Sequence, residues 1–293
     1  MSRQAVQTFL YAAWRVPGHV SDAWFPGPQP ISIERQHFSL LKQSEYLVTE
    51  KTDGVRHLLV SFETEDHEKC VALVNRAFDV TPVKYTLAKD TVLDGELVTR
   101  NDGKHVFLVH DAVMIRGESL LDAPLTERLD KAQTLTRSIL SKTPFITLVK
   151  PMVPLSRLST LVPGPYTTDG LVFTPVHEPI RTGTHETMFK WKPREHITID
   201  FQIEHGTDLC IQERGRLIKE ATLHTTCPYP DGTIVECSYG DVGWAIVKVR
   251  TDKTYPNNRR TFLRTIVNLR EDIQRQEFES LASSVPLNRM LPT

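Results

Sequence analysis

The sequence of 293 residues has few cysteines and no long apolar segment. Its cysteines are Cys70, Cys210, Cys227 and Cys237, and no two of them form a CxxC pair. Scattered single thiols argue against a disulfide framework and a structural zinc site, and they indicate a reducing compartment. Because the sequence has no run of about 18 apolar residues and no secretory signal, we expect a soluble protein that is neither secreted nor bound to a membrane.

The sequence also lacks a large excess of charge of either sign. Its 35 Lys and Arg residues are balanced by 36 Asp and Glu residues, so the formal net charge is −1. A protein that coats nucleic acid through bulk charge needs many uncompensated cations, and that class is therefore excluded. An enzyme with a local basic groove remains compatible with this composition.

The first two thirds of the chain combine strand and helix patterns. Apolar residues at helical spacing predict a helix over 3–14, and a second helix is expected within 118–142, with Asp122 as its N-cap. The proline-rich stretches 26–30 and 144–165 are expected to be loops. Runs rich in β-branched residues predict strands at 46–50, 55–62, 70–75, 91–98, 106–115 and 169–174.

The pattern changes after residue 194. Five short strand-like runs are separated by turn sequences between 197 and 250, which is typical of a small Greek-key barrel of the OB type. A single closing helix is expected over 259–283, and there is no internal repeat. We therefore predict an α+β fold with a larger domain of antiparallel sheets at 1–194 and a β-barrel with its helix at 195–293.

The segment with the clearest chemistry is Lys51-Thr52-Asp53-Gly54-Val55-Arg56. A lysine becomes a nucleophile where neighbouring cations or desolvation lower its pKa. In a tight connection between two strands, Gly54 would let the backbone approach a phosphate, and Arg56 could hold a ribose or a phosphate. Taken alone, the same segment also fits a surface hairpin with an Asp-Gly turn.

Further segments follow in a fixed order along the chain. Each has a plain interpretation as a turn or a solvated strand face, but their joint occurrence in this order favours a shared site. They are Arg76 in VNRAFDV, Asp94-Gly95-Glu96, the segment 107–120, Asp169-Gly170-Leu171-Val172-Phe173, Lys190 in MFKWKP, Asp200 in TIDF, and RTDKTYPN at 250–257.

On these collinear motifs, the chain resembles the covalent nucleotidyltransferases, a superfamily of capping enzymes and polynucleotide ligases. Within it, the chain is similar to the mRNA-capping guanylyltransferases, and most of all to the compact enzymes of large DNA viruses. The resemblance covers about residues 46–258. It implies a two-step reaction: a lysine attacks the α-phosphate of GTP, and the resulting lysyl-GMP passes GMP to the 5′-diphosphate end of RNA.

The resemblance also implies roles for residues of the larger domain. Lys51 would be the nucleophile, and Arg56 with Glu96 would hold the ribose hydroxyls. Arg76 would lie near the sugar or the phosphates. Asp169 would be the acid of a metal site for Mg²⁺ or Mn²⁺, since a carboxylate suits a hard cation.

Other cations are expected around the phosphates. By resemblance, Lys190 and Lys192 would contact the α-phosphate, stabilise the charge of the transition state and help to keep the nucleophile deprotonated. Arg250, Asp252 and Lys253, on the small barrel, would reach the β- and γ-phosphates when the two domains close. The barrel would then act as a lid that opens for RNA.

The expected base pocket departs from the family pattern at one position. His110 stands where the family has a phenylalanine that stacks on the base. A neutral imidazole can stack in its place, with Val172 on the other face of the base, and Phe107 is the alternative. Lys150 stands where a donor to guanine O6 is expected, although a surface lysine at a strand end fits this position equally well.

Two other functions fit parts of the sequence. A small ATP-dependent DNA ligase belongs to the same superfamily, but RTDKTYPN and the acid of DGLVF favour capping. A non-catalytic RNA-binding module would leave the grouping of Lys51, Glu96 and Asp169 unexplained. With GTP and 5′-diphosphate RNA as substrates, we expect a monomer in the nucleus, a viral factory or a virion, with the RNA triphosphatase and cap methyltransferase on separate polypeptides.

Overall fold

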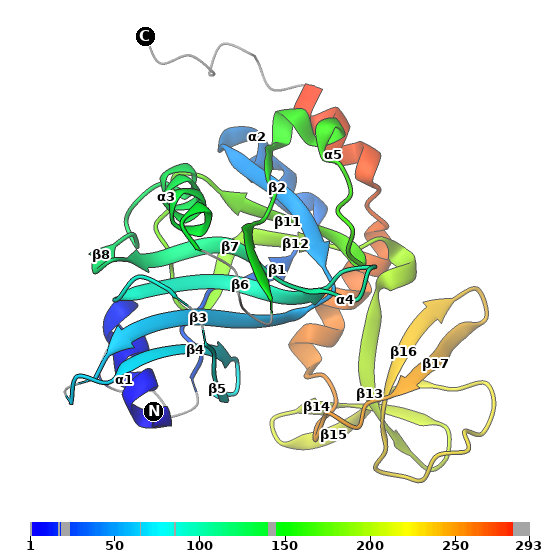
Figure 1. Ribbon diagram of the computed structural model, residues 1–293. Helices are drawn as coiled ribbons and strands as arrows, with labels where there is room; N and C mark the ends of the chain where they lie inside the picture. The colour runs from blue at the N-terminus through cyan, green and yellow to red at the C-terminus, as the bar shows by residue number, and fades with distance from the viewer. Residues whose placement is uncertain are drawn as a thin grey trace. The chain divides into compact units, whose positions relative to one another are not determined.

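The computed structural model describes residues 2–16, 18, 24–64, 66–84, 86–139 and 145–283. These residues form two compact units. The first unit comprises 2–31, 39–190 and 278–283, and the second comprises Ser32–Phe38 and Trp191–Glu277. The mixed α+β class expected from the sequence is confirmed, because helices and three largely antiparallel sheets make up the described chain (Figure 1).

The larger sheet of the first unit is antiparallel except at one edge, where β9 (Ile146–Val149) pairs with β7 in parallel. Each strand pairs with its neighbours in the order β5-β4-β3-β6-β7-β8. These strands are β5 (Val80–Pro82), β4 (Lys69–Asn75), β3 (Val55–Glu63), β6 (Thr91–Thr99), β7 (His105–Ile115) and β8 (Glu118–Ser119).

The smaller sheet of the first unit has five strands in the order β1-β12-β11-β2-β10. They are β1 (Gln29–Ser32), β12 (Thr184–Trp191), β11 (Thr168–Pro175), β2 (Tyr46–Thr52) and β10 (Val153–Pro154). The short helices α2 (Phe38–Gln43) and η2 (Leu155–Thr160) flank it in sequence.

Successive side chains of β3 point to opposite faces of the larger sheet, and apolar side chains occur on both faces. A helix therefore covers each face. Leu58 and Val60 point to one face and pack with Val6 and Leu10 of α1 (Arg3–Ala13). Leu59 points to the other face, in the cluster that includes Ala132 and Leu135 of α3 (Leu125–Arg137). Figure 1 shows α1 beside β3 and β4, and α3 beside β7.

The second unit is built on a sheet of five antiparallel strands in the order β15-β14-β13-β16-β17. The strands are β13 (Thr198–Glu204), β14 (Asp208–Glu213), β15 (Arg216–Thr222), β16 (Ile234–Gly240) and β17 (Gly243–Val249). Phe262 of α4 (Arg259–Glu271) packs into its core with Phe201. Among the described residues no pairing joins β15 to β17, so the closed OB barrel stays a prediction.

Four details differ from the sequence-based expectations. The proline-rich stretch 26–30 contains the start of β1, and 144–165 contains β9, β10 and η2. Asp122 does not cap α3, whose N-cap is Pro124. The helix expected over 259–283 is two helices, α4 and α5 (Arg275–Ser283), because Asp272 adopts a left-handed conformation with φ 41° and ends α4.

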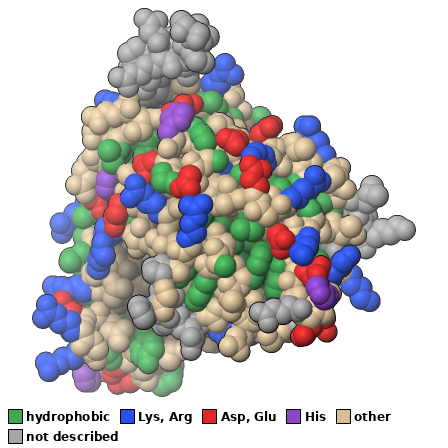
Figure 2. All heavy atoms as spheres, turned by 90° about the vertical axis from the view of Figure 1, so that its left-hand side faces the viewer, with side chains coloured by type: hydrophobic (Ala, Val, Ile, Leu, Met, Phe, Trp, Pro, Cys, Tyr) green, Lys and Arg blue, Asp and Glu red, His purple; other side chains and the backbone are tan. Residues whose placement is uncertain are grey.

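The surface agrees with the balanced composition. On the face drawn in Figure 2, lysine and arginine side chains are interspersed with aspartate and glutamate side chains. In the described part of the chain, no helix is long and apolar enough to cross a membrane.

One buried ion pair ties α3 to the larger sheet. Arg128 of α3 is 2% exposed and donates to Asp111 of β7 through Nε (2.7 Å to Oδ1) and Nη2 (3.0 Å to Oδ2). Its Nη1 also donates to the backbone carbonyls of Ala123 and Glu178. A guanidinium with this many partners can offset the cost of removing both charges from water.

We therefore expect Arg128→Ala to lower the free energy of unfolding of the first unit by about 3–5 kcal/mol, because it leaves the Asp111 carboxylate buried without its partner. Urea unfolding followed by circular dichroism would measure the loss. Arg137→Ala, at the exposed C-terminal end of the same helix, is the matched control and should change the value by no more than about 1 kcal/mol. Equal stabilities of the two variants would contradict a structural role for the buried pair.

Candidate active site

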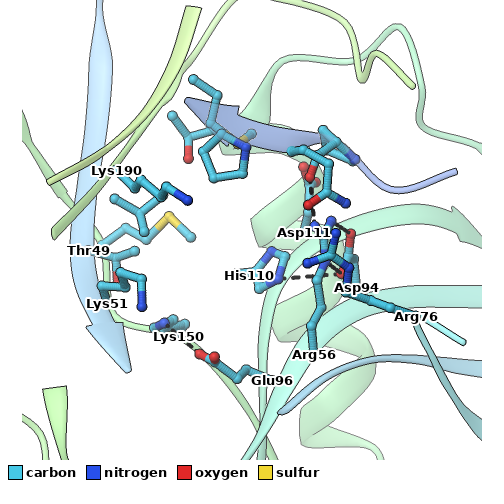
Figure 3. Close-up of a pocket in the computed structure, with 17 residues that line it drawn as sticks. Thr49, Lys51, Arg56, Arg76, Asp94, Glu96, His110, Asp111, Lys150 and Lys190 are labelled. Atoms are coloured by element: carbon cyan, nitrogen blue, oxygen red, sulfur yellow. Dashed lines mark hydrogen bonds and ion pairs between the residues drawn. The ribbon is translucent and has the colours of Figure 1, made fainter. Parts of the chain in front are cut away.

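A cavity of about 230 Å³ lies between the two sheets of the first unit (Figure 3). Residues of the smaller sheet form one wall, and residues of the larger sheet form the other. Eight residues singled out from the sequence line it: Lys51, Arg56, Arg76, Glu96, His110, Lys150, Val172 and Lys190. The fold therefore brings together residues that are up to 139 positions apart in the chain, Lys51 and Lys190.

Lys51 lies in β2 itself, and its side chain meets a carboxylate from the neighbouring strand. The distance from Lys51 Nζ to Asp169 Oδ1 is 2.7 Å. Asp169 reaches this position because the β2–β11 pairing shifts register between Thr168 and Leu171, where Gly170 has a φ of 150°. Such bulges re-aim side chains beside active sites, and the positive φ is one that glycine adopts without strain.

The connection after Lys51 is as tight as the sequence indicated, but Gly54 has a different neighbour. A Cβ at Gly54 would lie 2.6 Å from Val98 Cγ1 and 2.7 Å from the Leu97 carbonyl oxygen. Glycine is required here because the turn packs directly against β6. Gly54 does not line the cavity.

Arg56 meets a carboxylate that the sequence analysis did not assign. Its Nε donates to Asp94 Oδ1 (2.9 Å), its Nη2 donates to Asp94 Oδ2 (2.6 Å), and its Nη1 donates to the Pro28 carbonyl (2.6 Å). The bidentate edge of the guanidinium is therefore occupied by Asp94. Because a guanidinium has five N–H groups, two remain for a ligand.

His110 owes its orientation to a second bulge. Asp94 pairs with Asp111 and Gly95 pairs with Val109, so His110 has no cross-strand partner. The bulge lets both His110 and Asp111 line the cavity, although adjacent strand residues normally face opposite ways. His110 Nε2 lies 3.4 Å from Asp94 Oδ1.

The alternative stacking residue, Phe107, is enclosed elsewhere. It is fully buried in the cluster on the α3 side of the sheet, and its ring centroid lies 6.2 Å from that of Phe145. It does not line the cavity, so no base can stack on it there. Of the two candidates, only His110 lines the cavity.

The surroundings of His110 favour its neutral form. Burial lowers the pKa of His110 below 6.5, and the cations Arg56 and Lys150 lower it further, which together outweigh the opposing effect of Asp94 and Asp111. The pKa of Asp94 is itself held below its ordinary value, because burial, which disfavours its charge, is outweighed by Arg56 and His110. A neutral ring beside a charged carboxylate therefore faces the cavity at pH 7.

Lys150 is a buried lysine, not a surface one. It is 6% exposed, and its Nζ donates to Thr52 Oγ1 (2.8 Å) and lies 3.5 Å from Glu96 Oε2. The Thr52 hydroxyl also donates to Glu96. Burial lowers the pKa of Lys150, and Lys51 adds to this, while Glu96 opposes both. This lysine thus links the carboxylate expected to hold the ribose with the neighbourhood of Lys51.

The remaining sequence-based candidates belong to the second unit. Lys192 follows β12, and Arg250, Asp252 and Lys253 follow β17. Arg250 donates to Asp200 Oδ1 (2.7 Å) through Nη1 and to both Asp252 oxygens (2.9 and 2.8 Å) through Nε and Nη2. Within the second unit, these carboxylates hold the guanidinium in place.

A divalent cation fits this site only as a companion of a phosphate ligand. In the described part of the chain, no cluster of three or more His, Cys, Asp and Glu side chains could hold a metal ion. Mg²⁺ is typically held by one or two carboxylates together with substrate phosphates and water. Asp169 is not among the residues that line the cavity, but its carboxylate binds Lys51, which does line it, and so meets that requirement.

Sequence reasoning did not assign roles to Asp94, Asp111, Thr52 and Arg128. Asp94 stands in the DGE segment that was noted, so its place beside Glu96 could have been inferred from the period of two. Arg128 gave no signal, because an arginine on an amphipathic helix is usually solvated. The cavity wall also contains Met152 and Met188, to which the sequence analysis gave no role, although Met188 stands in the MFKWKP segment.

Because the folded-state pKa of His110 is depressed, His110 makes stability depend on pH. Above pH 6.5, neutral His110 makes its full contribution to the free energy of unfolding. As the pH falls below 6.5, this histidine takes up a proton in the unfolded chain before it does so in the folded protein. The folded protein therefore loses stability until the pH has passed the lower, folded-state pKa. We expect His110→Phe to remove this component. Melting temperatures of both proteins from pH 7.5 down to pH 5 would measure it, and identical slopes would contradict the assignment.

The comparisons with known proteins agree with the geometry. Residues 3–194 match the family described as mRNA capping enzyme, catalytic domain, and residues 184–278 match mRNA capping enzyme, C-terminal domain. The chain is 25% identical over 275 residues to the mRNA-capping enzyme of Danio rerio, covering 80% of this chain and 45% of that protein. It is 32% identical over 214 residues to the mRNA-capping enzyme subunit alpha of Schizosaccharomyces pombe, covering 61% and 53%.

The chain thus spans about half the length of these two relatives. The solved structure of mycobacterial DNA ligase D complexed with ATP and MES is 14% identical, with a TM-score of 0.46, and the match covers 80% of this chain and 97% of that one. At this identity and score, the likeness carries no argument about function. The catalytic-domain match alone extends over more than half of the residues, and the chain therefore belongs to the mRNA capping enzyme family.

Proposed function

We propose that this protein is an mRNA guanylyltransferase, which transfers GMP from GTP through a lysyl-GMP intermediate to the 5′-diphosphate end of RNA. The observation that carries the proposal is the convergence of Lys51, Glu96, Lys150 and Lys190 on one cavity beside Asp169. Family membership supports the reaction class. Positioning and charge neutralisation do most of the work of phosphoryl transfer, and this cavity offers both.

Lys51 would be the nucleophile of the first step. Its Nζ forms a bond to the α-phosphorus of GTP while the bond to the β-phosphate oxygen breaks, and pyrophosphate takes the electron pair. Nζ must lose a proton for this attack. Asp169 Oδ1, at 2.7 Å, is positioned to hold the ammonium beforehand and to accept that proton.

Asp169 would also hold the divalent cation, Mg²⁺ or Mn²⁺. When bound with the nucleotide, such a cation supplies neutralising charge for the triphosphate. Lys190 lines the same cavity, and its ammonium group would contact the α-phosphate. Lys150, which also lines the cavity, would add a second amine beside the phosphates.

The nucleoside would occupy the space between the two sheets. Glu96 would accept from the ribose hydroxyls, with Arg56 contributing the N–H groups that Asp94 leaves unused. The base would lie between His110 and Val172, which line the cavity from β7 and β11. Lys150 remains our candidate donor to guanine O6, in exchange for one of its present partners.

The second unit would complete the first step. Arg250, Asp252 and Lys253 would act on the β- and γ-phosphates and Lys192 on the α-phosphate, with the unit closing as a lid and opening again for RNA. Arg250 is bound by Asp200, by Asp252 and, at 3.3 Å, by Glu236, so a phosphate would compete with these carboxylates for the guanidinium. Asp252, which is 63% exposed, is the easiest of the three to displace.

The remaining proposals concern partners and location. GTP and 5′-diphosphate RNA are the proposed substrates. We propose that separate polypeptides supply the RNA triphosphatase and the cap methyltransferase, and that this chain works as a monomer. Its proposed place is the nucleus, a viral factory or a virion, as for compact capping enzymes of large DNA viruses.

Incubation with α-labelled GTP and, separately, α-labelled ATP tests the proposal. With Mg²⁺ or Mn²⁺ present, we expect label from GTP alone to stay on the denatured protein and to move to diphosphate-ended RNA. Lys51→Ala should abolish labelling, because no other amine takes its place. Lys51→Arg is the matched control: it keeps the charge beside Asp169 but cannot attack, and it should also remain unlabelled.

The other outcomes point elsewhere. Label from ATP together with sealing of nicked DNA would make the protein a ligase. If wild-type protein takes no label from either nucleotide but still binds RNA, the protein would be a non-catalytic RNA-binding module. Release of phosphate from triphosphate-ended RNA by the purified chain would contradict the separate triphosphatase.

A further inference from the structure

Arg76 differs from the other cations of the cavity. Lys51, Arg56 and Lys150 each lie against a carboxylate of the protein. Within the part of the chain that the structure describes, Arg76 lines the cavity without a hydrogen bond or an ion pair of its own. It is a cation that the protein leaves uncompensated at the edge of a binding site.

The position of Arg76 is fixed by its turn, not by its side chain. Asn75 Oδ1 accepts from the backbone N–H groups of Ala77 and Asp79 (both 2.9 Å). Phe78, two residues after Arg76, is buried in the core cluster that includes Val6 and Leu10 of α1. Arg3 of α1 donates to the Ala77 carbonyl (2.9 Å), which brings a second positive charge to the same turn.

The neighbourhood of Arg76 favours an anion. Partial burial and the nearby Arg56 guanidinium lower the pKa of Arg76, because both disfavour a further positive charge. The Asp94 carboxylate is not available as a full counter-charge for Arg76, because Arg56 already donates to both Asp94 oxygens. An anionic ligand is therefore the missing partner.

Figure 3 shows where that ligand would stand. Lys51 and Lys190 lie on one side of the cavity, and Arg56, Asp94 and Arg76 lie on the other. In phosphoryl transfer, the attacking and leaving atoms stand roughly in line on opposite sides of the phosphorus. A group that displaces Lys51 from the phosphorus must therefore arrive from the side away from Lys51, and Arg76 is a cation on that side of the cavity.

We propose that Arg76 binds the 5′-diphosphate of the acceptor RNA in the second step, and that it is not primarily a ligand of GTP. This assignment rests on the proposed function and deepens it. In the first step the same side of the phosphorus is occupied by the leaving pyrophosphate, for which Arg250 and Lys253 of the second unit are the proposed cations. Once that unit has opened for RNA, Arg76 is a cation of the cavity that, among the described residues, no protein carboxylate already binds, whereas a carboxylate binds each of the three cations compared with it above.

The step balances without a further reactant. A terminal β-phosphate oxygen of the RNA forms a bond to the phosphorus of the lysyl-GMP. The bond between that phosphorus and Lys51 Nζ breaks, and its electron pair returns to the nitrogen, which takes up a proton from water. Arg76 would hold the attacking phosphate through the planar edge of its guanidinium, which matches phosphate oxygens.

The test separates the two steps with Arg76→Ala. Lysyl-GMP would be formed from α-labelled GTP, freed of nucleotide and mixed with diphosphate-ended RNA at several concentrations. We expect formation of the intermediate within about threefold of wild type, and transfer at low RNA concentration slowed by about tenfold to a hundredfold, which is the effect of losing a hydrogen bond to a charged group. Arg76→Lys should recover part of the loss, since it keeps the charge but not the bidentate edge.

Arg137→Ala is the matched control, an exposed arginine of the same unit that does not line the cavity. Equal losses in both steps of Arg76→Ala would assign Arg76 to GTP, and wild-type transfer would leave it without a role in either step; each result overturns the proposal. A melting temperature like that of wild type would show that the variant folds. If wild-type protein takes no label from GTP, it is the proposed function that fails, and the two failures are thereby distinguished.

Discussion

Two buried carboxylates lie opposite each other on β6 and β7, and arginines from a neighbouring strand and from a helix balance their negative charges. Asp94 and Asp111 are cross-strand partners, and each is less than a tenth exposed. Adjacent like charges are tolerated in the interior only when each has a well-placed counter-charge. Arg56 supplies one from β3, and Arg128 supplies the other from α3. The same two pairs thus shape the cavity wall and fasten the helix to the sheet.

Lys51, the proposed nucleophile, lies between a carboxylate and a second lysine. The sequence led us to expect clustered cations around it, and Lys150 lies close enough for the two charges to interact. The hydrogen-bond partner of Lys51, however, is the Asp169 carboxylate. In the proposed reaction, Asp169 would have to release Lys51 when phosphates and a cation bind.

Local patterns were enough to predict the long strands of the larger sheet, whereas β12 was not predicted and the features that shape the cavity depend on long-range pairing. Alternation along β3 and β7 is written in neighbouring residues, so both strands were predicted to within a residue or two. The bulge at His110 is a property of two strands in register and leaves no mark in either sequence alone. The burial of Arg128 is likewise set by a partner 17 residues away. The strand at Gln29 was missed because proline usually marks a loop, although an edge strand tolerates it.

The second unit is discontinuous, and this affects how it can be separated from the rest. Ser32–Phe38 belongs to it although the bulk of the unit begins at Trp191. That short segment is bonded into the unit at several points: Arg35 pairs with Glu277, its amide N–H binds Glu271, and Asn268 donates to the Ile33 carbonyl. A fragment that begins at residue 191 would lack segment 32–38 and these contacts, and it would expose Glu271 at the C-terminal end of α4 to solvent. To isolate the unit intact, 32–38 would have to be grafted back, as a tethered peptide or in a permuted chain.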